Sequence, residues 1–146
     1  MADDWSAKRR EVVAAQERAL AHARQAEHAK ATALLRDAAR DFEAAGIAPH
    51  PLSAHPYSGS RPVKTTLVGW YLKMDRTVGF DPEGRYYILS APGDLLTRLR
   101  GASIEATDAP LVVGRGGRDG EAIELSILLS LRRRDPVPPA TLAGGR

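Results

Sequence analysis

The chain has 146 residues, of which 43% are hydrophobic and eight are aromatic, and its net charge is +3. This length suffices for one modest core but not for a two-domain enzyme. The lack of cysteine excludes disulfides, thiol nucleophiles and cysteine-ligated zinc. No apolar run is long enough to span a membrane, and the acidic start at Asp3 and Asp4 does not resemble a signal peptide. We therefore expect a cytoplasmic protein with no membrane partner.

Residues 1–46 predict a long amphipathic helix. The segment from Asp4 to Ala45 contains neither proline nor glycine, and Gly46 is well placed to end the helix. At about 100° per residue, the larger apolar side chains fall within one stripe roughly 140° wide. The stripe consists of Trp5, Val12, Val13, Leu20, Leu34, Leu35 and Phe42.

The length of this helix predicts a partner. About 40 residues at 1.5 Å each make a rod near 60 Å, whereas the rest of the chain would have a radius of gyration of about 13 Å. A break between Ala21 and Ala33 could fold the helix into a hairpin, but no glycine or proline marks one. We therefore favour a straight helix whose stripe pairs with a second copy, with a coiled coil as one form of this pairing, or with another helical protein.

Residues 47–62 predict a linker, because four prolines and a glycine interrupt this stretch. His50 and His55 lie here without a neighbouring carboxylate, and His22 and His28 point in different directions on the helix. We therefore expect neither a metal site nor a cofactor.

Residues 63–134 predict a small α+β domain, followed by a disordered tail over residues 135–146. The domain begins with an antiparallel meander whose turn, Asp81-Pro82-Glu83-Gly84, has the residues of a type I turn. The expected strands are Val63–Lys73, Arg76–Phe80, Arg85–Ser90 and Leu111–Val113, and the expected helices are Asp94–Arg100 and Glu121–Arg133. The predicted fold class is α+β, with a long N-terminal helix, a small antiparallel sheet and a C-terminal helix.

A glycine-rich loop is the first candidate ligand site, because a strand, a glycine loop and a helix N-terminus can present backbone amides to a phosphate. Its residues are Gly114, Arg115, Gly116, Gly117 and Arg118. The loop is neither a Walker loop nor a dinucleotide fingerprint. In the alternative interpretation, Asp119 caps the following helix and the glycines only make a tight connection.

An aromatic surface is the second candidate. Five of the eight aromatic residues lie between Trp70 and Tyr87 and are interleaved with basic residues. Aromatic side chains on a sheet with flanking cations can stack single-stranded nucleic acid. Neighbouring strand residues point to opposite faces. We therefore expect Trp70 and Tyr87 to point inward, leaving Tyr71 and Tyr86 covered by a helix or exposed for binding beside Arg76 and Arg85.

The tripeptide Trp70-Tyr71-Leu72 resembles the one that names the WYL domain of bacterial regulators. The resemblance implies an Sm-like β-barrel that binds nucleic acid or nucleotide ligands. It covers three of the 146 residues, and the family's arginine-rich strand has no counterpart beyond Arg85. On these residues we do not assign the chain to the family.

No arrangement of serine, histidine and aspartate typical of a hydrolase is recognisable, so an enzyme is the less favoured interpretation. The sequence favours a non-enzymatic interaction or assembly protein whose long helix mediates oligomerisation or binds a partner helix. The alternative is a module that binds nucleic acid or a nucleotide phosphate through the glycine-rich loop, the arginines and the aromatic strands.

Overall fold

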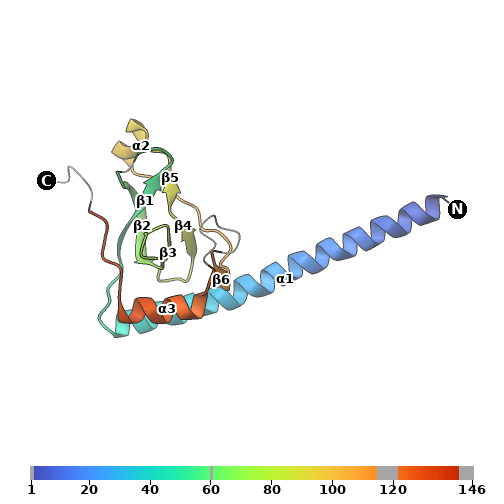
Figure 1. Cartoon of the computed structure of the whole chain (residues 1–146), viewed down its shortest axis with the longest axis horizontal. Coiled ribbons are helices and arrows are strands. Elements are labelled where there is room, and N and C mark those ends of the chain that lie inside the picture. Colours follow the sequence, from blue (N-terminus) through green and yellow to red (C-terminus); the bar gives the residue numbers. More distant parts are fainter. Residues whose placement is uncertain (1, 60, 115–121, 142–146) are drawn as a thin grey trace.

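The computed structural model describes residues 2–59, 61–114 and 122–141. Its fold is α+β with a long N-terminal helix and a C-terminal helix, as predicted (Figure 1). The described elements are α1 (Ala2–Ala44), β1 (His50–Pro56), β2 (Val63–Tyr71), β3 (Val78–Phe80), β4 (Tyr86–Ile88), β5 (Ser90–Ala91), α2 (Leu95–Arg100), β6 (Val112–Val113), β7 (Ile123–Glu124) and α3 (Leu125–Arg134). The five-stranded sheet is mixed, whereas an antiparallel sheet was predicted, because β5 pairs parallel to β1.

The long helix α1 is uninterrupted, which confirms the straight helix and excludes the hairpin. Its alanine-rich sequence has no helix breaker before its end. Gly46 then takes a left-handed backbone conformation with φ of 82°. This allows the amide of Ile47 to donate a 2.8 Å hydrogen bond to the carbonyl oxygen of Phe42, closing the last turn.

The five strands follow the order β4-β3-β2-β1-β5. β2, β3 and β4 form the predicted antiparallel meander, and β5 runs parallel to β1. The predicted turn between β3 and β4 is confirmed, since the amide of Gly84 donates a 3.0 Å hydrogen bond to the carbonyl oxygen of Asp81. Gly84 has φ of 81°, a conformation that favours glycine.

The prediction of a linker over residues 47–62 is wrong for its central part, because β1 lies there and pairs with both β2 and β5. Leu52 and Ala54 of this strand are only 1% exposed. Proline is tolerated because the register shifts between Pro51 and Ser53, and Pro56 is the last residue of the strand. The two buried side chains outweigh the turn-like composition of the segment.

The core consists of two clusters. The first joins the C-terminal half of α1 and α3 to the sheet, and includes Ala31, Leu35, Ala39, Phe42, Trp70, Phe80, Tyr86, Leu125 and Leu128. The second includes Leu52, Val63, Tyr71, Tyr87, Leu89 and Val137. Successive strand residues point to opposite faces, so each of the pairs Trp70-Tyr71 and Tyr86-Tyr87 contributes one ring to each cluster. Trp70 and Tyr87 are buried, as expected, but they belong to different clusters.

The C-terminal segment also differs from its prediction. The final helix, α3, begins at Leu125 because Ile123 and Glu124 first pair with β6. The described part of the expected disordered tail packs against the sheet. Val137 is 5% exposed in the second cluster, and Arg76 Nε donates a 3.1 Å hydrogen bond to the carbonyl oxygen of Pro138.

Candidate interaction site

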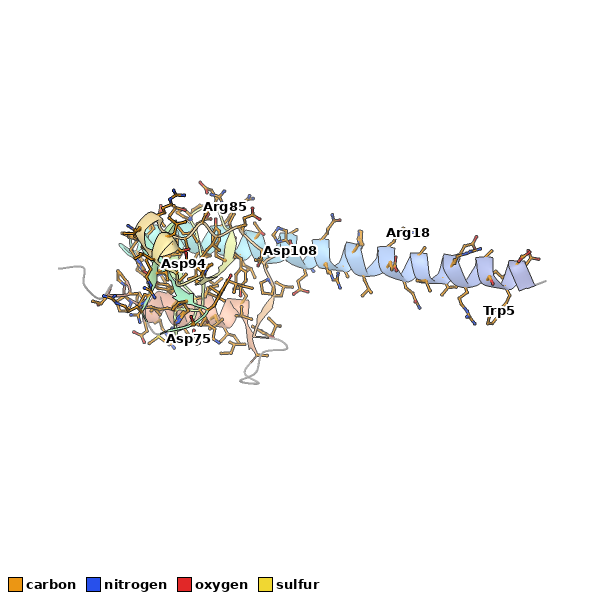
Figure 2. All side chains as sticks on the ribbon, turned by 90° about the horizontal axis from the view of Figure 1, so that it is seen from above. Trp5, Arg18, Asp75, Arg85, Asp94 and Asp108 are labelled. Carbon is orange, nitrogen blue, oxygen red and sulfur yellow. The ribbon has the colours of Figure 1, made fainter. Side chains whose placement is uncertain are left out.

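The N-terminal part of α1 projects from the rest of the molecule. We call residues Asp3–Ala26 the arm. Every side chain in the arm is exposed except that of Ala14, which is half-buried. Figure 1 shows α1 extending well beyond the sheet and α3, and Figure 2 shows Trp5 and Arg18 along this projecting part, far from the other labelled residues.

Four of the seven residues of the predicted stripe lie on the arm and are solvent-exposed. The exposed fractions are 62% for Trp5, 56% for Val12, 47% for Val13 and 58% for Leu20. The guanidinium carbon of Arg9 lies 4.0 Å from the centroid of the Trp5 ring, so an arginine covers one face of that indole. The arm therefore presents apolar side chains that no other described part of the chain covers.

Two of the three remaining stripe residues belong to the core. Leu35 and Phe42 are 0% and 2% exposed, and Leu34 is 36% exposed at the margin of the packed face. The Phe42 ring makes edge contacts with Trp70 and Phe80, with centroid separations of 5.7 and 5.8 Å. Assigning Leu35 and Phe42 to an interaction surface was therefore wrong, because the sheet and α3 cover them.

Two polar side chains attach α1 to the domain where the arm ends. His28 Nδ1 accepts a hydrogen bond of 2.9 Å from the amide of Ala109. A Glu27 carboxylate oxygen accepts one of the same length from the amide of Leu111. Both amides lie in the segment before β6. Hydrogen bonds from the domain backbone to α1 side chains therefore join helix and domain, in addition to the packing of the core.

The glycine-rich loop falls almost entirely outside the described residues. Gly114 is described, with φ of 91° after β6. Arg115, Gly116, Gly117 and Arg118 are not, so the anion-binding hypothesis stays a prediction.

A cavity of about 500 Å³ lies next to Gly114, between the β3–β4 edge and the segment before β6. Its walls are mostly apolar and include Val78, Ile88 and Val112. Tyr86 also lines it, and burial raises the pKa of its phenol to about 12, so the ring stays neutral. Lys73 and Asp108 supply charge at the lining.

The predicted aromatic surface does not form, because Tyr71 and Tyr86 are only 1% and 5% exposed. Their rings belong to the two core clusters, Tyr86 to the first and Tyr71 to the second. The chain has few other large side chains to fill these clusters. Arg76 lies near Tyr71, with its guanidinium carbon 5.8 Å from the ring centroid. Without exposed rings, these strands lack the stacking surface that single-stranded nucleic acid needs.

Arg85 serves the turn between β3 and β4. Its Nε donates a 2.7 Å hydrogen bond to the buried carboxylate of Asp81, which also accepts one of 2.9 Å from the Tyr87 hydroxyl. The bond to Asp81 and its negative charge raise the pKa of the Arg85 guanidinium. Burial, followed by the bond to Asp81, raises the pKa of Tyr87. These groups hold the hairpin together.

Sequence reasoning missed a second exposed apolar patch. Leu95, Leu96 and Leu99 of α2 are 73%, 55% and 68% exposed. Figure 1 shows α2 at the end of the domain away from α1. The three leucines were recognisable in the sequence as one side of a short helix, but their exposure depends on how α2 lies on the domain.

No protein-family model matches the chain, and no curated protein or solved structure is significantly similar to it. None of the helices in the described ranges is both long and apolar enough to cross a membrane. Within residues 2–59, 61–114 and 122–141, no three histidine, aspartate or glutamate side chains converge as metal ligands would.

Proposed function

We propose that this protein is an assembly protein that self-associates through the arm, with each small α+β domain at the end of a paired helix. The observation that carries the proposal is the exposure of Trp5, Val12, Val13 and Leu20 on a helix that extends beyond its own domain. Exposed apolar side chains gathered on one element are typical of protein interaction sites.

The physics of an isolated helix supports the same proposal. Most helical stability in proteins comes from packing an apolar face, and unpacked helices are marginal in water. The arm continues from the part of α1 that packs on the domain, so it needs no separate helix nucleation. Nothing in the described domain packs against the arm itself. A second helix along the stripe would supply the missing packing.

The strength of the contact can be bounded. Full burial of a Val or Leu side chain contributes about 1.5–3 kcal/mol. The four exposed apolar residues of each arm are roughly half-exposed before association. The free energy gained by burying them on both arms is therefore comparable with the cost of association, about 4–15 kcal/mol. We therefore expect a reversible oligomer whose population depends on protein concentration.

Light scattering on the full chain tests this proposal. We expect a mass above the 15.7 kDa of one chain that falls on dilution. Leu20→Glu should reduce it to one chain, because a carboxylate would be desolvated in the contact. Ala21→Glu is the matched control, since Ala21 lies on another side of the helix and this variant should associate normally. A wild-type mass of 15.7 kDa at every concentration would contradict the proposal.

A further inference from the structure

The exposed apolar residues of the arm are spaced symmetrically along the chain. Trp5 and Val12 are seven residues apart, and so are Val13 and Leu20. The set is therefore symmetric about the midpoint between Val12 and Val13. A helix with such a pattern matches its own reversed copy, because each of the four apolar residues then lies opposite another apolar residue.

We infer that the arm pairs with the arm of a second copy in the antiparallel orientation, with the two-fold axis between Val12 and Val13. This inference rests on the proposed self-association. In this register Trp5 lies level with the partner's Leu20, and Val12 with the partner's Val13. The overlap runs from Asp3 to His22, a length of about 30 Å at 1.5 Å per residue.

The two residues at the middle of the stripe are also matched. On a helical projection of about 100° per residue, Arg9 and Gln16 lie between the edge formed by Trp5 and Val12 and the edge formed by Val13 and Leu20. The antiparallel register places Arg9 level with the partner's Gln16, whose amide oxygen can accept a hydrogen bond from a guanidinium. The stacked Arg9 and Trp5 side chains would then enter the interface together.

The charges beside the stripe agree with this orientation. Glu17 and Arg10 lie on the same edge of the arm, as do Arg24 and Asp3. Antiparallel pairing brings each edge against the same edge of the other copy. Glu17 then lies within one turn of the partner's Arg10, and Arg24 within one turn of the partner's Asp3. Both contacts join opposite charges, and the symmetry repeats each of them.

The parallel alternative is unfavourable for two reasons. An in-register parallel pair would place Arg9 beside Arg9 of the partner subunit at the centre of the contact, and like charges in contact are destabilising. It would also place both domains at the same end. In each copy the domain packs on the part of α1 beyond the arm (Figure 1). In the antiparallel pair the two domains therefore lie at opposite ends, and neither obstructs the helices.

Disulfide trapping tests the orientation and the register, because the chain has no cysteine of its own. Full-length Arg9→Cys and Gln16→Cys are prepared separately, mixed and oxidised. We expect the mixed disulfide to dominate, at several times the yield of either homodimer, because level positions approach each other while residue 9 lies about 10 Å along the axis from its own copy. Glu11→Cys, on the outer side of the arm, is the matched control and should form little disulfide.

The outcomes are distinguishable. A dominant Arg9→Cys homodimer would overturn the inference in favour of parallel pairing. A dimer mass without the mixed disulfide would overturn the register. Light scattering on the same two variants shows whether they still associate. A wild-type chain that never exceeds one copy would instead refute the proposed function itself.

Discussion

The two halves of α1 belong to one continuous helix but differ in what covers them. Residues 18 apart lie on the same line of a helix, because 18 residues make about five turns. Ala31 and Ala38, which are 0% and 9% exposed, therefore lie in line with Val13 and Leu20, which are 47% and 58% exposed. One helical line is thus buried against the domain at one end and open to solvent at the other.

The apolar stripe completes the core in one half of α1, and in our proposal it mediates association in the other. In the docked half, from Glu27 to Ala44, the stripe completes the core of its own domain, where Phe42 contacts two aromatic rings. Glu27 and His28 add hydrogen bonds from domain amides. In the arm the same kind of stripe is available to another chain. Four experiments separate these roles if the docked half is probed for stability and the arm for association.

The largest difference should come from shortening the chain. A chain starting at Gln25 keeps the docked half and should unfold cooperatively, whereas one starting at Pro49 loses Leu35 and Phe42 and should not fold. Amide exchange or near-ultraviolet circular dichroism would report the outcome. A folded chain from Pro49 would show that α1 is not part of the core.

Within the full chain, Phe42→Ala should lower the free energy of unfolding by about 3–5 kcal/mol, because it opens a cavity beside Trp70 and Phe80. Leu20→Ala is the counterpart in the arm and should leave unfolding of the domain nearly unchanged. Urea denaturation, at a protein concentration where the arms are dissociated, measures the free energy of unfolding of both variants. Equal losses in the two variants would contradict the division of α1.

A smaller effect is expected where the two halves meet. Glu27→Ala leaves the amide of Leu111 without its carboxylate acceptor and should cost about 1–3 kcal/mol. The matched change in the arm, Glu17→Ala, should not affect the stability of the domain. Hydrogen exchange at Leu111 should accelerate in the first variant only. Unchanged exchange there would show that Glu27 does not attach the helix.

The Leu20→Glu variant proposed above makes the complementary comparison, because it should change the mass of the assembly without changing the fold. If it unfolded the domain instead, the arm would be part of the core after all. Circular dichroism of the dissociated protein distinguishes these outcomes, with Ala21→Glu again as the control.

Local signals in the sequence predicted several elements well. The Asp81–Gly84 turn and the absence of helix breakers before Gly46 depend on a few neighbouring residues, and both are confirmed. The β1 strand was missed because its prolines indicate a loop, whereas pairing with β2 and β5 and the burial of Leu52 override them. The arm was predicted as an interaction surface, but its boundary with the domain was not.

The sequence by itself determined the fold class, the single long helix and the apolar stripe, because helix propensity and periodicity are properties of neighbouring residues. Only the tertiary structure decided that Leu35 and Phe42 belong to the core while Val13 and Leu20 stay exposed, and that Tyr71 and Tyr86 are buried. The physical reason is that burial depends on which distant elements meet. One periodic stripe can therefore serve the domain at one end and remain open at the other.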